Sequence, residues 1–178
     1  MIELYDRYSQ ESRDLHESLV ATGLSQLGVV IDADGFLPDG LVSPFTYYLG
    51  YEKGKPLYFN QVPVPAFWEI SGNNQSARIE DMTQERALIH YADGMQARLV
   101  KQVDWKDLEG RVRQVDHYNR FGACFATTTF SADSEPVMTV YQDVNGQEVL
   151  LENHVTGDIL LTLPGQSMRY FATKVEFI

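Results

Sequence analysis

Turn-forming residues recur at a spacing of twelve through the second half of this 178-residue chain. They are Gly110, Gly122, Ser134, Gly146 and, one residue early, Gly157. A strand of roughly eight residues followed by a tight turn accounts for such a spacing. The pattern therefore predicts consecutive antiparallel hairpins, which together form an extended β-meander. The pair Asn145-Gly146 is the strongest turn signal, because both residue types accept the positive φ angles of a tight hairpin turn.

The N-terminal residues predict a different arrangement. Residues 1–6 have an extended pattern, and Ser9 stands where the N-cap of a helix is expected. In the helix that follows, Leu15 and Leu19 form an apolar face. The β-branched run at residues 29–31 then predicts a second strand. Strand, helix and strand in this order indicate one βα unit of an open α/β layer.

Prolines punctuate the short aromatic runs that come after this layer. We expect residues 45–48 and 57–59 to be short strands and turns. Pro63 and Pro65 have no amide hydrogen to donate to a β-ladder, which places them at a sheet edge or at a crossing between layers. An extended pattern resumes at residues 67–70.

The meander is expected to carry polar side chains on both faces. Between residues 111 and 118, one face holds Val112 beside Gln114 and Asp116, and the other mixes arginines with Val115. A sheet with one buried face would show a uniformly apolar set of alternate residues. We therefore expect a sheet that is largely solvated on both sides. Because long bare edges are seldom left open, we also expect something to pair with the sheet or to cover it.

These patterns predict an α+β fold that is mostly β. An extended antiparallel β-meander is attached to the start of a Rossmann-like α/β lobe. We place the boundary near residue 50, so the expected domains are residues 1–50 and residues 51–178. A chain of this length with 44% hydrophobic residues can bury a core without disulfides, and a single cysteine allows none within the chain.

The charge of the chain limits its partners. A formal net charge of −11 repels the phosphate backbone of nucleic acids and anionic lipid head groups, and no cluster of lysines and arginines opposes it. No run approaches the ~20 apolar residues of a membrane span, and the charged N-terminal residues do not resemble a secretory signal. We expect no nucleic acid partner, no direct membrane insertion and a cytoplasmic location, with docking at the membrane possible only through a second protein.

No nucleotide-binding loop is found at the expected place. An α/β unit that binds phosphates needs glycines between its first strand and helix, because backbone amides must approach the phosphates closely. Residues 7–12 contain no glycine, and the first glycine of the chain is Gly23. We therefore expect no cofactor and no catalytic site in this layer.

The histidines do not predict a metal site. They lie far apart and lack the spacing of three or four residues that puts two ligands on one helical face. His16 is interpreted as a surface residue of the helix. His117 and His154 could meet across strands, but hydrogen-bonded sheet histidines are the better interpretation.

Catalytic groups are equally hard to find. Among 25 carboxylates, a pair such as Glu69 and Asp104 is expected by chance, so it predicts no hydrolytic site. Cys124 lies in a β-like run without a histidine nearby in sequence, which is typical of a buried thiol rather than a nucleophile.

Four aromatic residues of the meander are the candidate interaction residues. Tyrosine and tryptophan supply large contact areas at protein interfaces. The alternative is that these side chains fix the strand register by packing across strands. A weaker alternative is a carbohydrate-binding β-module that uses Trp68 or Trp105 as a stacking platform. The candidates for a partner interface are Trp105, Tyr118, Phe130 and Tyr141.

Several runs of the sequence resemble one protein family. They are QESRDLH (10–16), GFLP (35–38), SPFTY (43–47), FNQVP (59–63), FWEISGN (67–73), VDW (103–105), GRVR (110–113) and ENHVTGDIL (152–160). These runs are similar to the stabilising, non-catalytic subunit of the accessory-Sec O-linked N-acetylglucosamine transferase of streptococci and their relatives. The resemblance extends over essentially the whole chain.

The resemblance implies a protein that partners a catalytic glycosyltransferase and helps it to recognise serine-rich repeat adhesins, before these are exported by the accessory Sec system. The donor sugar nucleotide would bind to the partner. Members of the family are built like two-lobed glycosyltransferases with an extended β-sheet domain inserted in the first lobe, and the sheets of the two subunits dock together. They also continue beyond residue 178, so the resemblance implies that this chain corresponds to their N-terminal part.

Two hypotheses from different classes follow. In the first, residues from about 51 to 178 dock on a matching sheet of the catalytic subunit, and polypeptide recognition is a shared role. In the second, the chain has glycosyltransferase or sugar-binding activity of its own, against which the missing glycine loop argues. Titration with UDP-N-acetylglucosamine separates the two, because the first predicts no heat of binding. A possible complication is self-association through an uncovered sheet edge.

Overall fold

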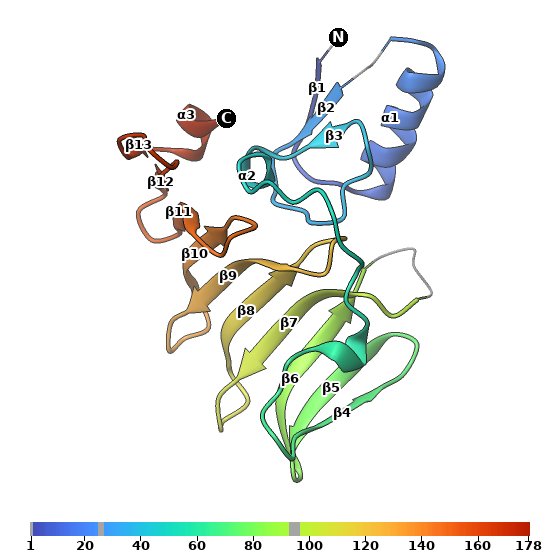
Figure 1. Cartoon of the computed structure of the whole chain (residues 1–178), viewed down its shortest axis with the longest axis vertical. Coiled ribbons are helices and arrows are strands. Elements are labelled where there is room, and N and C mark those ends of the chain that lie inside the picture. Colours follow the sequence, from blue (N-terminus) through green and yellow to red (C-terminus); the bar gives the residue numbers. More distant parts are fainter. Residues whose placement is uncertain (1, 25–26, 93–96) are drawn as a thin grey trace.

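The computed structural model describes residues 2–24, 27–92 and 97–178. It contains a small parallel sheet with one helix beside it and a long antiparallel sheet below (Figure 1). The small sheet has the strand order β1-β2-β3, and the long sheet has ten strands in the order β13 to β4. The sequence prediction of a mostly β chain with a large antiparallel sheet is confirmed.

The N-terminal layer forms the expected βα unit. Strand β1 (Ile2–Tyr5) is followed by helix α1 (Gln10–Ala21) and by β2 (Leu27–Val30), which pairs in parallel with β1. The helix begins at Ser9, whose hydroxyl accepts a hydrogen bond from the backbone N–H of Ser12 at 3.2 Å. A third parallel strand that was not predicted, β3 (Leu41–Val42), pairs with β2. Met1, which the predicted first strand includes, lies outside the described residues.

The buried face of α1 is polar, contrary to the sequence prediction. Leu15 is 53% exposed and Leu19 is half-buried, whereas the buried residues of the helix are Ser12 and His16. The interpretation of His16 as a surface residue is therefore wrong. The reason is that β1 turns Glu3 towards the helix, so a hydrogen-bonding side chain is required opposite it.

The aromatic runs after this layer form helical turns, and within the second run Tyr58 also makes an isolated antiparallel β-bridge with Leu99. Helix α2 (Pro44–Tyr47) begins at Ser43, whose hydroxyl accepts from the N–H of Phe45 at 3.3 Å. Proline suits this first helical position, because its missing N–H would be unpaired there. A short 3₁₀ helix, η1, covers Phe59–Gln61. Pro63 and Pro65 lie in the crossing that leads to the first strand of the long sheet, as predicted.

The long sheet is a β-meander in which every strand pairs with its neighbours in sequence. The predicted turns all adopt positive φ: 79° at Gly110, 84° at Gly122, 61° at Ser134, 76° at Gly146 and 82° at Gly157. The strands are β4 (Glu69–Gly72), β5 (Ser76–Asp81), β6 (Gln84–Tyr91), β7 (Val100–Lys106), β8 (Val112–Tyr118), β9 (Cys124–Phe130), β10 (Pro136–Gln142), β11 (Glu148–Asn153), β12 (Ile159–Leu161) and β13 (Arg169–Phe171).

The two faces of the meander are covered at opposite ends of the sheet. Paired residues point to the same face, so the register assigns Ile89, Val103 and Trp105 to one face and Ala126 and Tyr141 to the other. We name them the Trp105 face and the Tyr141 face. Each carries one of the two cores of the sheet.

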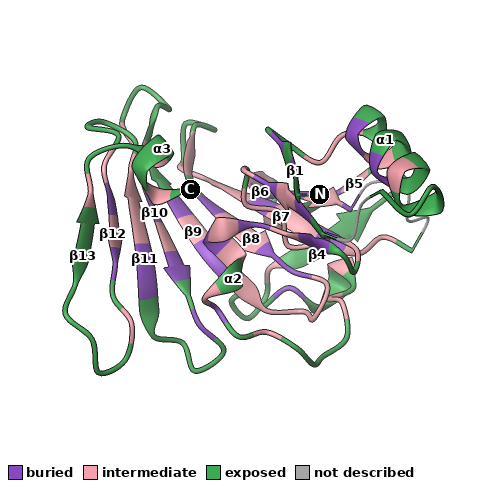
Figure 2. Cartoon of the chain, turned by 90° about the horizontal axis from the view of Figure 1, so that it is seen from above, coloured by how far each residue is buried: buried purple, intermediate pink, exposed green. Residues whose placement is uncertain are grey.

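Each core is closed by chain segments from outside the meander. Residues 57–68 pack on the Trp105 face over β4 to β7, and residues 45–51 together with helix α3 (Lys174–Phe177) pack on the Tyr141 face over β9 to β13. The expectation of a sheet solvated on both sides is wrong for these halves, because these segments supply the missing apolar cover. The stripes of buried residues across β9, β10 and β11 are visible in Figure 2.

None of the helices in the described part of the chain is long and apolar enough to cross a membrane.

Candidate interaction site

The predicted interface aromatics lie at different depths. Tyr118 and Tyr141 are buried, at 7% and 4% exposure, whereas Trp105 and Phe130 are half-buried. Trp105 donates its indole N–H to Oδ2 of Asp116 at 2.7 Å, and Tyr141 donates its hydroxyl to Oε2 of Glu152 at 3.1 Å. The structure does not bring the four together into one surface patch, because Trp105 and Tyr141 point to opposite faces.

The two buried tyrosines act in packing within this chain. Burial raises the pKa of Tyr118, and burial together with the carboxylate of Glu152 raises the pKa of Tyr141. Both phenols therefore remain protonated at neutral pH. Tyr141 packs against Phe45 with ring centroids 5.2 Å apart, which ties α2 to the sheet.

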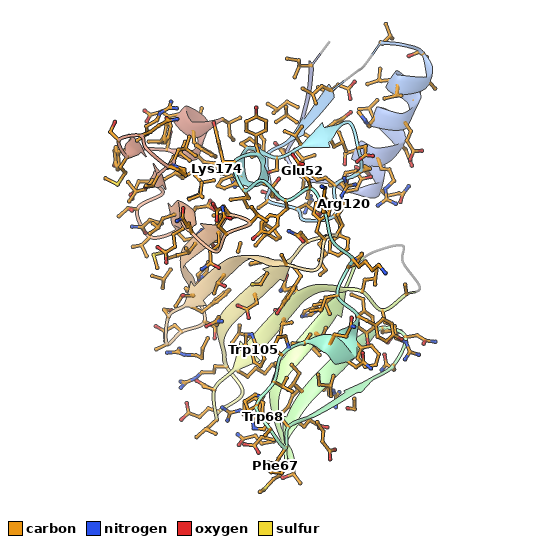
Figure 3. All side chains as sticks on the ribbon, in the orientation of Figure 1. Glu52, Phe67, Trp68, Trp105, Arg120 and Lys174 are labelled. Carbon is orange, nitrogen blue, oxygen red and sulfur yellow. The ribbon has the colours of Figure 1, made fainter. Side chains whose placement is uncertain are left out.

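Three strongly exposed apolar side chains lie in or beside turns at the end of the long sheet that lies away from the parallel layer. Phe67 is 99% exposed, Met82 94% and Leu108 70%. Figure 3 shows Phe67 at this end of the molecule, below Trp68 and Trp105. We name these three residues the distal tip.

The distal tip is built from three neighbouring chain reversals. Phe67 precedes the edge strand β4, Met82 lies in the turn between β5 and β6, and Leu108 lies in the turn between β7 and β8. The last two turns are joined by a hydrogen bond of 2.7 Å from the side-chain amide of Gln84 to the carbonyl of Leu108. Connected turns therefore present these apolar side chains together.

Two residues of the distal tip also have an unfavourable backbone conformation. Phe67 has φ 73° and Met82 has φ 56°, which are left-handed conformations that cost a non-glycine residue roughly 1–2 kcal/mol. Bulky apolar residues in strained, solvent-exposed positions bring no folding benefit that offsets this cost. Such outliers point to a functional constraint. The sequence prediction missed these residues, since turn residues carry no periodic signal of exposure.

A second open surface lies on the Trp105 face of the C-terminal strands. The register aligns Val140, Leu151, Leu160 and Tyr170 in one row across β10 to β13. The first three are half-buried and Tyr170 is 63% exposed. This row lies on the same face as the core of the Trp105 face, but residues 57–68 do not extend over it. An apolar strip therefore remains open on β10 to β13.

The Tyr141 face holds a chain of hydrogen-bonded polar side chains instead. His117 Nε2 lies 2.9 Å from the hydroxyl of Thr128, which lies 2.8 Å from the hydroxyl of Thr139, and His154 Nε2 follows at 2.7 Å. Burial lowers the pKa of His117. The interpretation as a hydrogen-bonded sheet histidine is confirmed for His117 on β8. His154 is hydrogen-bonded as expected but lies in the turn after β11, and two threonines stand between the histidines.

The sequence candidates for metal binding and catalysis lie apart in the structure. No group of three or more potential metal-ligating side chains occurs among them. Glu69 on β4 and Asp104 on β7 are separated by two strands, and Asp104 pairs with His90 at 2.8 Å. Burial raises the pKa of the Cys124 thiol to about 11, so the thiolate needed for nucleophilic attack is scarce at neutral pH.

Neither tryptophan offers a free platform for sugar stacking. The guanidinium of Arg86 lies 5.2 Å from the ring centre of Trp68, and Trp68 packs against the core of the Trp105 face. Trp105 packs against the same core. These contacts argue against the carbohydrate-binding alternative.

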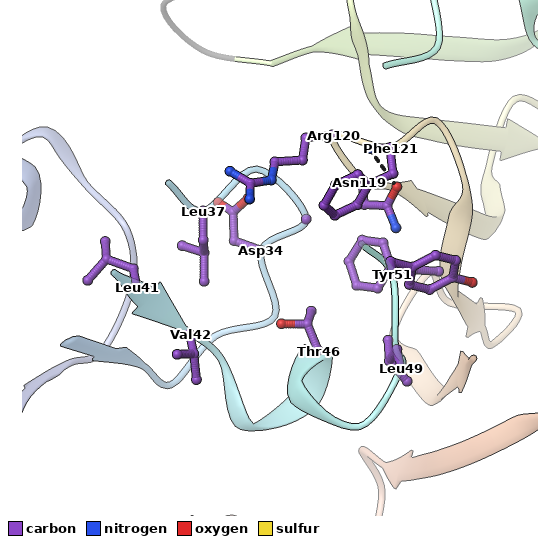
Figure 4. Close-up of a pocket in the computed structure, with 12 residues that line it drawn as sticks. Asp34, Leu37, Leu41, Val42, Thr46, Leu49, Tyr51, Asn119, Arg120 and Phe121 are labelled. Atoms are coloured by element: carbon purple, nitrogen blue, oxygen red, sulfur yellow. Dashed lines mark hydrogen bonds between the residues drawn. The ribbon is translucent and has the colours of Figure 1, made fainter. Parts of the chain in front are cut away.

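Polar contacts fix the parallel layer on the meander. Arg120 pairs with Asp39 at 2.6 Å, and its backbone N–H donates to the carbonyl of Gly35 at 2.9 Å. Lys101 pairs with Asp34 at 3.0 Å. A cavity of about 180 Å³ lies between these contacts and α2 (Figure 4). It is smaller than the ~300 Å³ at which ligand pockets begin, so it is best described as a packing gap between the two layers.

Comparison with known proteins identifies the family. Residues 68–172 match the model of the GtfB middle domain, and residues 2–48 match that of the GtfB N-terminal domain. The chain belongs to the GtfB family. It is 92% identical over its full length to a protein of Streptococcus pneumoniae serotype 4 that is named UDP-N-acetylglucosamine–peptide N-acetylglucosaminyltransferase stabilizing protein GtfB. The chain spans 40% of the length of that relative.

Solved structures show the same fold. A chain in the crystal structure of a GtfA/B complex bound to UDP and GlcNAc is 53% identical and superposes with a TM-score of 0.95, over 99% of this chain and 40% of its own. The pneumococcal O-GlcNAc transferase GtfA, solved with UDP and GlcNAc, superposes with a TM-score of 0.62 at 13% identity, over 99% of this chain and 39% of its own. This second likeness concerns the fold alone.

Proposed function

We propose that this GtfB-family chain belongs to the non-catalytic, stabilising and acceptor-recognition subunit of a protein O-GlcNAc transferase complex. Its β-meander docks on the catalytic glycosyltransferase subunit, and the complex glycosylates serine-rich repeat adhesin before accessory-Sec export. The observation that carries the proposal is the exposed apolar distal tip on a chain whose relatives are named stabilising proteins. Accordingly, the donor sugar nucleotide and the catalytic groups belong to the partner.

The distal tip is suited to binding a folded partner. Burial of a large apolar side chain contributes roughly 1.5–3 kcal/mol, and aromatic anchors at the centre of an interface contribute most. The chain reversals that carry Phe67, Met82 and Leu108 lie at the end of the meander away from the parallel layer, where a partner can approach without meeting that layer. Both edge strands are short, four residues in β4 and three in β13, which favours docking through side chains over pairing of strand edges.

The partner we propose has the same architecture. GtfA superposes on 99% of this chain, so its fold includes a corresponding meander. Two like folds can associate through corresponding surfaces in a pseudo-twofold arrangement. The open row of Val140, Leu151, Leu160 and Tyr170 offers a further apolar surface for such a contact. The interface role of Trp105, Tyr118, Phe130 and Tyr141 stays a prediction, and for the two buried tyrosines it would act through neighbours that they support.

We further propose that residues 1–50 begin a Rossmann-like glycosyltransferase lobe and that residues 51–178 form the sheet domain. The ends of the two family matches, at residues 48 and 68, support a boundary between them. Residues 6–9, which connect β1 to α1, contain no glycine, in keeping with a lobe that binds no nucleotide phosphate at this loop. We propose a cytoplasmic location, with contact to the inner face of the membrane through a partner.

The test is co-purification of the chain with the catalytic GtfA subunit, with sizes measured by light scattering. A stable complex would support docking through this part of the protein. If both proteins are folded and no complex forms, the docking surface lies elsewhere and the proposal fails. Calorimetric titration of the chain with UDP-N-acetylglucosamine should give no heat of binding, and saturable heat would favour the enzyme hypothesis instead.

A further inference from the structure

A groove of about 410 Å³ runs between α1 and the connection from β2 to β3. Parallel strands are usually joined by a crossover helix, which packs beside the preceding helix. Here residues 31–40 cross without a helix, so α1 faces a loop, and the space beside it stays partly open. Tyr8, Val20 and Pro38 are among the residues that line this groove. Its volume falls within the range of roughly 300–1,000 Å³ that is typical of ligand pockets.

His16 is held in the wall of this groove by a buried carboxylate. His16 is only 7% exposed, and its Nδ1 lies 3.0 Å from Oε2 of Glu3. The same oxygen accepts a hydrogen bond from the hydroxyl of Tyr5, whose pKa burial and Glu3 raise to about 12. An ionised carboxylate only accepts hydrogen bonds, so Nδ1 of His16 must be the donor to Oε2 of Glu3 and carries a proton. The bond fixes both the orientation of the ring and the nitrogen that remains for other partners.

That remaining nitrogen faces the groove. A Cβ atom placed on Gly40, which lines the groove, would lie 3.6 Å from Nε2 of His16. In the described part of the chain, Nε2 has no hydrogen-bond partner. The fully enclosed polar atoms without a partner in the described residues do not include Nε2. This nitrogen of a largely buried ring can therefore be reached by a molecule in the groove.

Arg13 lies one helical turn before His16 on the same face of α1. Its guanidinium stacks 5.0 Å from the ring centre of Tyr8. Its Nε is buried and has no hydrogen-bond partner among the residues that the structure describes. The wall of the groove therefore carries two polar side chains one turn of a rigid helix apart, and neither Nε of Arg13 nor Nε2 of His16 has a hydrogen-bond partner among the described residues.

We propose that this groove binds a hydroxyl-bearing ligand, with the hydroxyl bonded to Nε2 of His16 and an adjacent oxygen accepting from Arg13. A hydroxyl fits because it both donates and accepts hydrogen bonds. An anion is disfavoured because the carboxylates of Glu17 and Asp39 line the same groove. A metal ion would need further ligands, and the described residues contain no cluster that supplies them. The hydroxyl can come from a serine or threonine of a polypeptide or from a saccharide.

The proposal is independent of docking at the distal tip, and its test can distinguish the two. The protein in its full natural length is labelled with ¹⁵N at histidine, and the imidazole signals are followed while one of two probes is added. The first probe is a soluble peptide rich in serine and threonine, and the second is N-acetylglucosamine. Saturable displacement of the Nε2 signal of His16 by either probe is the expected result, and the probe that causes it identifies the source of the hydroxyl.

Two substitutions make the result specific. His16→Phe keeps an aromatic ring but removes Nε2, and Arg13→Met removes the guanidinium. Each should weaken binding by at least about tenfold, as expected for loss of a hydrogen bond in a buried site. Ser18→Ala, an exposed position on the same helix outside the groove, should bind like the wild type. All three should still form the complex with the catalytic subunit, which separates failure here from failure of the docking proposal.

Two results would overturn the inference. One is the absence of any displacement of the His16 signal by both probes at millimolar concentration. The other is equal affinity of the wild type and the Arg13→Met variant. Because the first measurement needs only the wild-type protein, it remains decisive even if His16→Phe fails to fold.

Discussion

Replacing one turn glycine of the meander by alanine should reduce the free energy of unfolding by very different amounts at different turns, although the turns have the same spacing and similar φ angles. At Gly110 and Gly146, a Cβ atom would meet nothing within 4 Å. Replacement by alanine there costs only the strain of a left-handed conformation, roughly 1–2 kcal/mol, partly offset by the lower entropy of the unfolded chain. We expect a net loss of about 1 kcal/mol in the free energy of unfolding for Gly110→Ala.

Gly122 lies against another segment of the chain. A Cβ atom there would be 2.3 Å from the carbonyl oxygen of Lys55 and 3.5 Å from the backbone nitrogen of Leu57. Backbone atoms must therefore move by about 1 Å to reach an ordinary contact, and the carbonyl of Leu57 accepts a hydrogen bond from Val100 at 2.9 Å. Overpacking adds roughly 1–3 kcal/mol, so we expect Gly122→Ala to lose about 2–4 kcal/mol.

The comparison is made by urea denaturation, followed by circular dichroism and by tryptophan fluorescence. With an unchanged slope against urea, the midpoints of Gly110→Ala, Gly122→Ala and wild type give the two losses in stability. Gly146→Ala serves as a second control and should match Gly110→Ala. Equal losses for Gly122→Ala and Gly110→Ala would refute the reasoning, because they would mean that residues 54–57 do not rest on this turn.

Two further predictions concern titratable groups. The hydrogen bond to Asp104 raises the pKa of His90. Burial alone would raise the pKa of Asp104, but the hydrogen bonds from His90 and Gln102 have the larger combined effect, so the pKa of Asp104 is lowered. In the unfolded chain, Asp titrates at pH ~4 and His at pH ~6.5, so the pair stabilises the fold fully between these two pH values. The stabilisation is lost as the pH rises through the pKa of His90 in the folded protein. In urea titrations, wild type should exceed His90→Gln by up to about 1 kcal/mol at pH 5 and by less at pH 8, and a pH-independent difference would contradict the pairing. Cys124 should react with a thiol reagent at pH 8 far more slowly in the native protein than in urea, and equal rates would contradict its burial.

The meander could be predicted from the sequence because its turns obey a local rule. Each reversal needs one residue at positive φ, and glycine or a small polar residue marks that position at a constant interval. Even Ser134, the only non-glycine in the series, adopts φ 61°. A local requirement that repeats along the chain is visible without knowledge of the contacts between distant segments.

Burial was harder to predict, because it depends on which distant segments meet. The runs around Phe45 and Phe59 have strand-like composition, but apart from a single β-bridge at Tyr58 they fold as helical turns that cover the two faces of the sheet. His16 is buried because β1 places Glu3 opposite the helix, a pairing that separates the partners by thirteen residues. The mixed polar and apolar residues of β8 indicated a solvated sheet. That prediction was wrong because the segments that cover the sheet lie outside the meander in the sequence.

The candidate site was partly visible in the sequence. Aromatic residues of the sheet suggested an interaction surface, but the structure places Tyr118 and Tyr141 inside the cores. The exposed set of Phe67, Met82 and Leu108 could not be found by alternation, since each residue lies in a turn or at its border. Only the arrangement of the turns at one end of the sheet brings them together.

The most direct test of the account is the affinity of the tip variant for the catalytic subunit. The variant combines Phe67→Ser, Met82→Ser and Leu108→Ser, and its matched control is Val175→Ser, an apolar position that is 85% exposed on α3. Loss of an interface anchor costs roughly 2 kcal/mol or more, so we expect the dissociation constant with GtfA to rise at least about thirtyfold for the tip variant and to be unchanged for the control. A folded tip variant that binds GtfA as tightly as the wild type would contradict docking through the distal tip.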